Sequence, residues 1–177
     1  MSILKIARLG HPILRKTAIE VANEKIPSSE LQRLIDDMID TMREYDGVGL
    51  AAPQVHQSLR ITVVESLSNP RYPDAPDIPL TILINPKFSH MSEEITEGWE
   101  SCLSIDDFRG KVPRARELKV SAFDRTGEKI FLEAAGFFAV VLQHEMDHLN
   151  GMVYLDRMKD MKTLAHMKEY IKYWEQK

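Results

Sequence analysis

Cysteine is nearly absent from this sequence. Cys102 is the single cysteine among 177 residues, so no internal disulfide can form and the chain suits a reducing compartment. In such a protein a lone thiol is core filler, a nucleophile or a metal ligand. The scarcity of cysteine therefore makes Cys102 a candidate for chemistry without deciding which chemistry.

Long apolar runs are absent as well. The longest ones are far too short to cross a bilayer, which argues against a membrane-spanning protein. After Met1, the residues Arg8, Gly10 and Pro12 interrupt the first apolar stretch, unlike a secretory or transit peptide. We expect the protein to stay where it is made and to have no membrane partner.

An excess of positive charge is also missing. The net charge is −4, with 23 Lys and Arg against 27 Asp and Glu, which argues against nucleic acid as the main partner and against recognition of a specific nucleic-acid sequence. Residues 157–177 do carry an excess of positive charge, with six Lys or Arg and three Asp or Glu. The tail is mildly basic, either as a solvated face or as a surface for a polyanionic partner.

What is present is the composition of an ordinary globular protein, with 44% hydrophobic and 28% charged residues. A chain of this length fits one domain, which we take to span 1–177. Between 27 and 47 a helix is predicted: Ser29 is the expected N-cap, Gln32 would complete a capping box, and Asp46-Gly47 ends the helix. Its apolar stripe comprises Leu31, Leu34, Ile35, Met38, Ile39, Met42 and Tyr45.

Short β-rich runs follow, separated by turn residues, at 60–66, 80–85, 117–124 and 129–133. Prolines 70, 73, 76 and 79 predict a stiff extended loop. A second helix is predicted from Gly136 to Asn150-Gly151, and a third, amphipathic one is predicted over 161–174. The pattern predicts an α+β fold, with mainly antiparallel sheets packed around the second helix and amphipathic helices toward the two ends.

The second predicted helix carries the string His144-Glu145-Met146-Asp147-His148. At about 100° per residue the two histidines lie only about 40° apart around the helix axis, so both imidazoles can reach one ion. Glu145 lies on the same side and can approach a water held by that ion, which is the position of a general base. The string predicts a metal-dependent hydrolase.

A catalytic site of this type needs three protein ligands and an open position, so the histidines require one partner. Cys102 is the candidate upstream, and Asp156, Glu169 and Glu175 are the candidates downstream. A glutamate, for which Glu169 is best placed, would indicate a zinc endopeptidase of the thermolysin type. The string alone does not choose between these alternatives.

Three motifs in order resemble the peptide deformylases: GVGLAAPQ at 47–54, ESCLS at 100–104 and QHEMDHLNG at 143–151. GHPILRK at 10–16 and VPR at 112–114 extend the resemblance over nearly the whole chain. Two positions depart from the family pattern, because Ser101 stands where glycine is usual and Asp106-Asp107 replaces a common Pro-Gly pair. A serine at 101 is strained if the position needs a positive φ, and it narrows the entrance if it lines the pocket.

The resemblance implies metal ligation by Cys102, His144 and His148. It implies that Glu145 is the general base and later the general acid, and that the Gln54 amide and the Leu103 N–H stabilise the oxyanion. The implied substrate is the N-formyl-methionyl end of a newly made polypeptide in a bacterial cytoplasm, with formate as a product. The family's usual ion is Fe(II), and zinc, nickel or cobalt also suit such a site. A catalytically inactive homologue kept for binding is the remaining alternative.

Several residues are expected near the substrate. Val48 and Val141 are expected walls of a methionine pocket, Gly49 would let a peptide backbone come close, and Ser101 would line the entrance. Arg109 serves either the substrate mouth or an ion pair, whereas Arg114 is expected to be structural and Asp147 to support the histidines. For the basic tail, the ribosome is the natural polyanionic partner of an enzyme that acts on nascent chains.

Overall fold

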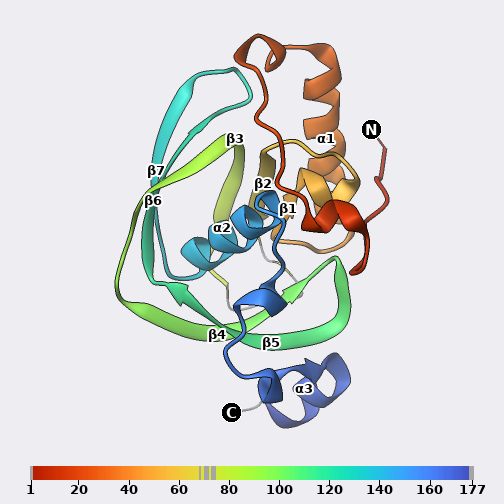
Figure 1. The fold of residues 1–177 in the computed structure, drawn as a ribbon, viewed down its shortest axis with the longest axis vertical. Helices are drawn as coiled ribbons and strands as arrows, with labels where there is room; N and C mark the ends of the chain where they lie inside the picture. The colour runs from red at the N-terminus through yellow and green to blue at the C-terminus, as the bar shows by residue number, and fades with distance from the viewer. Residues whose placement is uncertain (1, 68, 70–71, 73–74, 176–177) are drawn as a thin grey trace.

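The structure is a computed structural model that describes residues 2–67, 69, 72 and 75–175. Helix α2 (Gly136–Leu149) lies at the centre of the molecule, in contact with strands of two antiparallel sheets (Figure 1). The larger sheet has the order β1-β2-β3-β6-β7 and the smaller one the order β4-β5-β8. The strands are β1 (Gly49–Ala51), β2 (Ile61–Ser66), β3 (Ile78–Met91), β4 (Ile95–Cys102), β5 (Ile105–Ala115), β6 (Glu117–Phe123), β7 (Lys129–Ala135) and β8 (Ala165–His166).

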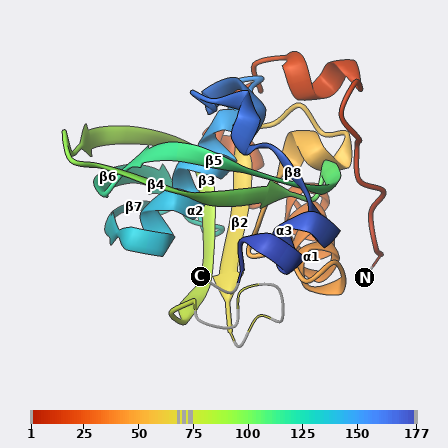
Figure 2. The ribbon, with the colours of Figure 1, turned by 90° about the horizontal axis from the view of Figure 1, so that it is seen from below.

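All neighbouring strands in both sheets pair antiparallel, as the sequence predicted. The four predicted strands correspond to β2, β3, β6 and β7, but β3 is much longer than 80–85. Strands β4 and β5 were not predicted, because charged and polar residues interrupt their apolar pattern. In Figure 2 these two strands run across β2 and β3. Of the proline series, Pro70 and Pro73 lie outside the described residues.

Helix α1 (Ser29–Glu44) has Ser28 as its N-cap, so the prediction of Ser29 was wrong by one residue. The Ser28 hydroxyl accepts the Leu31 N–H at 3.3 Å. Gln32 makes no capping box, because it lies one residue beyond the N3 position that Ser28 sets and its side-chain oxygen accepts a hydrogen bond from Arg125. Its NH₂ group donates to the Ile26 and Arg125 carbonyls. The predicted stripe is buried except for Leu34, which is half-buried, and Tyr45, which is 39% exposed. The stripe packs on β1 and β2 and thereby closes one side of the core.

Helix α2 begins and ends as predicted. Asn150 is its C-cap, and the following Gly151 has a φ of +73°. A side chain there would collide with the backbone of Arg15, whose carbonyl carbon would lie 2.8 Å from the added Cβ. Glycine at 151 therefore lets the chain leave α2 against the N-terminal segment. No helix of the described chain is long and apolar enough to cross a membrane.

The prediction of one amphipathic helix over 161–174 was wrong. The segment forms a 3₁₀ turn (Met161–Thr163), strand β8 and the short helix α3 (Met167–Tyr173). Strand β8 pairs with β5 through Phe108 and Arg109, so tertiary pairing replaces the helix that the periodicity favoured. Of the expected stripe, Met161, Ile171 and Trp174 are 56%, 47% and 47% exposed. Tyr170 is the buried residue of α3.

Candidate metal centre

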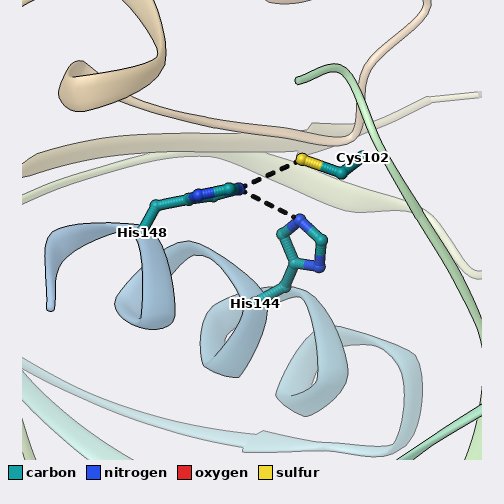
Figure 3. A group of neighbouring side chains, drawn as sticks. All are labelled: Cys102, His144 and His148. Atoms are coloured by element: carbon teal, nitrogen blue, oxygen red, sulfur yellow. Dashed lines mark hydrogen bonds between the residues drawn. The ribbon is translucent and has the colours of Figure 1, made fainter. Parts of the chain in front are cut away.

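Three side chains from two distant segments meet beside α2 (Figure 3). The Cys102 thiol lies 3.2 Å from Nε2 of His148, and Nε2 of His148 lies 3.3 Å from Nε2 of His144. All three ligand atoms lie within 4.8 Å of one another; Cys102 and His148 are buried, and the His144 side chain is 11% exposed. A thiol and two imidazoles converging in this way are a donor set that suits zinc, iron(II), nickel or cobalt.

The helical spacing of His144 and His148 places both imidazoles on the side of α2 that meets the end of β4. Cys102 is the last residue of β4, and the pairing of β4 with β5 is irregular between Glu100 and Cys102. The irregularity lets the strand turn its thiol toward the helix. The site is therefore held by one helix and one strand end rather than by a loop.

The downstream candidates for a third ligand lie elsewhere. Glu169 and Glu175 are exposed on and after α3. The Asp156 carboxylate accepts the Val153 N–H and pairs with Arg15. Within the part of the chain that the structure describes, Cys102 is the one acidic or thiol residue grouped with the two histidines. The ligand set expected of a thermolysin-type endopeptidase is not assembled.

Glu100 is a residue of the site that the sequence reading missed. Its carboxylate lies 2.8 Å from Nδ1 of His144 and also accepts two hydrogen bonds from Arg114, at 2.7 and 2.9 Å. Burial would raise the pKa of Glu100, but the hydrogen bonds from Arg114 and His144 outweigh burial and lower it to about 2. A carboxylate at Nδ1 favours the proton there and leaves Nε2 of His144 for a metal. The one signal in the sequence was its place in the motif ESCLS, two residues before Cys102.

Arg114 is held by two buried carboxylates, Glu100 on one side and Asp147 on the other, the latter at 2.6 Å. Asp147 also accepts from Arg157, at 2.7 Å. This arrangement supports the structural interpretation of Arg114. Asp147 contacts neither histidine directly, so its support reaches His144 only through Arg114 and Glu100.

Glu145 is 3% exposed and faces β1. Burial raises the pKa of its carboxyl to about 7, although the neighbouring imidazoles of His144 and His148 oppose the shift. A methyl group at Gly49 would overlap this side chain, with its carbon 2.8 Å from Cδ of Glu145. Gly49, expected to admit a peptide backbone, thus has a second reason to be glycine, which is to leave room for Glu145.

Gln54 and Ser104 surround the thiol from the other side. Oε1 of Gln54 accepts the Ala51 N–H at 2.9 Å, which turns the amide NH₂ toward the Cys102 sulfur at 3.5 Å and the Ser104 hydroxyl at 3.3 Å. The Ser104 N–H also points at the sulfur, at 3.4 Å. Burial would raise the pKa of the Cys102 thiol, but the imidazoles of His148 and His144 hold it well below its usual value.

A cavity of about 180 Å³ opens beside these residues. Its lining includes Val48, Gly49, Gln54, Ser101, Cys102, Leu103, Val141, His144 and Glu145, together with Tyr72, Trp99, Phe137 and Val140. The expected pocket residues except Arg109 therefore face one space, and its far wall is apolar. Leu103 fixes the N-terminal segment by accepting a hydrogen bond from Arg8 on its carbonyl, at 2.6 Å.

The two departures from the family pattern have different consequences. Ser101 does not have a positive φ, so serine causes no backbone strain there, and its hydroxyl lies 2.9 Å from that of Tyr72 in the cavity wall. The strained conformation occurs at Asp107, with a φ of +62°. Arg109 lies behind the wall, with its guanidinium 5.2 Å from the Tyr72 ring centre. Among the described residues it meets the cavity wall at Tyr72.

Comparison with known proteins gives one consistent result. The family model described as polypeptide deformylase matches residues 3–164. Peptide deformylase 1 of Bordetella pertussis is 46% identical over 161 residues, which cover 91% of this chain and 90% of the relative. Peptide deformylase 2 of a Nostoc species is 44% identical over 168 residues, covering 95% and 93%.

Solved structures agree with these relatives. The Met-Ala-Ser-bound class I type b peptide deformylase from Acinetobacter baumannii superposes with a TM-score of 0.86 at 42% identity, covering 89% of this chain and 99% of that one. The peptide deformylase from Synechococcus elongatus in complex with actinonin has a TM-score of 0.81 at 34% identity, covering 96% and 84%.

Proposed function

The chain belongs to the polypeptide deformylase family of hydrolases, and we propose that it hydrolyses the N-formyl group of the formyl-methionine that begins newly made polypeptides, releasing formate. The observation that carries the proposal is the grouping of Cys102, His144 and His148 beside a cavity that Cys102, His144 and Glu145 line. The C–N bond of the formamide breaks, water supplies the hydroxyl of the acid, and the peptide leaves with a free amino group.

In the proposed site, Cys102, His144 and His148 hold one divalent metal ion. Fe(II) is favoured by the resemblance, and zinc, nickel or cobalt also suit the donor set. When bound, such an ion polarises a carbonyl oxygen and makes water acidic enough to attack near neutral pH. Glu100 holds His144 in the tautomer that leaves Nε2 for the ion.

Glu145 is proposed to move the proton. Its carboxylate takes a proton from the attacking water and later gives it to the leaving nitrogen, so that the peptide does not leave as an amide anion. Gln54 and the backbone N–H of Leu103 are proposed to donate hydrogen bonds to the oxygen of the tetrahedral state. The fixed Gln54 amide supports this role, because donors that are already oriented need no reorganisation during the reaction.

The cavity is proposed to take the methionine side chain. Val48 and Val141 supply apolar walls, and Gly49 leaves the path beside Glu145 open. Ser101 narrows the entrance through its contact with Tyr72. The Acinetobacter relative is described as bound to Met-Ala-Ser, which has the form of a deformylated product. Formyl-Met-Ala-Ser is therefore the substrate of choice for a first assay.

We further propose that residues 1–177 act as one catalytic domain in a bacterial cytoplasm. The basic residues Lys162, Lys168 and Lys172 are all exposed and are proposed to meet the ribosome, which carries nascent formyl peptides. Co-sedimentation with ribosomes should weaken when these three lysines are changed to glutamine. Unchanged co-sedimentation would count against the contact.

The activity is tested by measuring formate released from formyl-Met-Ala-Ser by the iron- or nickel-loaded protein. We expect turnover by the wild type and little by Cys102→Ser, assayed alongside. Cleavage of internal peptide bonds without formate would instead indicate an endopeptidase. Tight peptide binding with neither product would indicate an inactive homologue.

A further inference from the structure

The C-terminal segment 165–175 lies beyond the residues that the family model matches, which end at 164. It nevertheless packs against the part of the molecule that forms the cavity. Strand β8 pairs with β5, and α3 follows beside the small sheet (Figures 1 and 2). The Lys111 N–H also donates to the Thr163 hydroxyl, at 3.3 Å, which secures the approach to the segment.

Aromatic rings join this segment to the cavity wall. Trp99 of β4 lines the cavity, and its ring meets that of Tyr170 edge to face at 4.9 Å. Trp174 lies on the same indole, at 5.6 Å. Aromatic pairs in this geometry contribute beyond the area they bury. The position of Trp99 in the wall therefore depends on α3.

A second connection runs through Arg109. Its guanidinium lies 4.7 Å from the ring centre of Tyr170 and 5.2 Å from that of Tyr72, and Tyr72 lines the cavity. Arg109 and Tyr170 are 7% and 8% exposed, so these cation–π contacts are shielded from water. Tyr72 in turn holds Ser101 through their hydroxyl groups. Tyr170 thus supports two parts of the outer wall, Trp99 by direct contact and Tyr72 through Arg109.

We propose that Tyr170 is a positioning residue for substrate binding, which acts on the outer wall of the cavity through Trp99 and Arg109. The inference rests on the proposed deformylase function and adds a determinant of peptide affinity outside the matched family region. Tyr170 touches none of Cys102, His144, His148 or Glu145, so it acts on binding and not on the bond-breaking step.

The test compares Tyr170→Leu, which keeps an apolar side chain but removes the ring, with Tyr170→Phe, which keeps the ring. For formyl-Met-Ala-Ser we expect Tyr170→Leu to raise KM about three- to tenfold, the size of effect that lost aromatic and cation–π contacts produce, with kcat within about twofold. The KM of Tyr170→Phe should equal that of the wild type. Ile171→Ala, on the same helix at 47% exposure, is the matched control and should leave both constants unchanged.

Fluorescence supplies a readout that does not depend on turnover. Trp99 and Trp174 are the two tryptophans of the chain, so Trp174→Phe leaves Trp99 as the single reporter. In that background Tyr170→Leu should shift the Trp99 emission to longer wavelength. It should also weaken binding of the peptide Met-Ala-Ser to the metal-loaded protein by the same factor as KM, whereas Ile171→Ala should do neither.

The outcomes separate the two proposals. If the wild type releases formate but Tyr170→Leu leaves KM and the Trp99 emission unchanged, the positioning role is wrong and the proposed function stands. If the wild type releases no formate, the proposed function fails. The emission of Trp99 still decides whether Tyr170 holds Trp99 in position in the cavity wall. A kcat that falls with KM unchanged would also overturn the inference.

Discussion

The two sheets of this molecule bury different kinds of side chain. The larger sheet contributes Val63, Val64, Leu83, Leu118 and Val120 to apolar clusters, all at most 1% exposed. The smaller sheet buries apolar residues such as Ile105 and Val112 as well, but it adds the charged residues Glu100, Arg109 and Arg114, at 4–7% exposure. A buried ion network is weak evidence for stability, because desolvation offsets much of its Coulomb energy. The comparison teaches that the larger sheet stabilises the fold while the smaller one orients the site.

The largest expected effect comes from removing the ligand supplied by the small sheet. Cys102→Ser should bind metal much more weakly, with activity falling accordingly, because the thiolate is the form that coordinates. Glu169→Ala on α3 is the control and should keep both the metal and the activity. Metal stoichiometry by plasma emission spectrometry checks this, and a fully loaded, fully active Cys102→Ser protein would overturn the site.

Next in size is Glu145→Gln, which separates proton transfer from metal binding. We expect the metal to stay, while kcat falls by about 10²–10⁴, the usual contribution of a positioned acid–base group. Rate and metal content are measured on the same preparation. Near-normal turnover by the loaded variant would contradict the role given to Glu145.

A substitution in the larger sheet should lower stability and leave metal binding unchanged. Leu118→Ala removes a buried side chain from the apolar cluster of β3 and β6, so the free energy of unfolding should fall by about 2–5 kcal/mol. Metal affinity of the folded protein should not change. Urea unfolding and a chelator competition distinguish the two quantities, and a loss of metal affinity without loss of stability would break the division between the sheets.

Glu100→Gln tests the same division from the small sheet. The amide has no charge to balance Arg114, and its oxygen accepts the Nδ1 proton of His144 more weakly, so metal affinity should drop by about 10–100-fold, as for other weakened partners of metal-binding histidines. The amide keeps the shape of the side chain, so it is the mildest probe available. Metal affinity equal to that of the wild type would mean that Glu100 serves Arg114 alone.

The smallest effect is expected at Asp107, in the small sheet but exposed and away from the cavity lining. Its φ of +62° is unfavourable for a side chain with a Cβ, so Asp107→Gly should raise stability by about 0.5–1 kcal/mol. Asp107→Ala removes the charge but keeps the Cβ, and it should give no such gain. Thermal unfolding of the two variants provides the measurement.

Local patterns predicted the elements whose residues repeat with a clear period. The apolar stripe of α1 and the capped span of α2 are visible in the sequence, and with α2 comes the pairing of His144 with His148. The charged strands β4 and β5 have no such period and were missed. The tail was predicted to be one helix because the residues that pair with it in β5 are 56 and 58 positions away. For Arg109 the sequence left the substrate mouth and an ion pair open, and the structure places its guanidinium beside the Tyr72 ring.

By itself the sequence determined that two histidines and a glutamate share one side of a helix, because helical geometry is fixed within a few residues. The helix string left the third partner open among four candidates, and the resemblance to the peptide deformylases implied Cys102. Only the tertiary structure brings Cys102 to the histidines, Glu100 to His144 and Gly49 to Glu145, since these contacts join segments 40 or more residues apart in the sequence. Their formation depends on how β4 and β1 pack against α2, which no local repeat encodes.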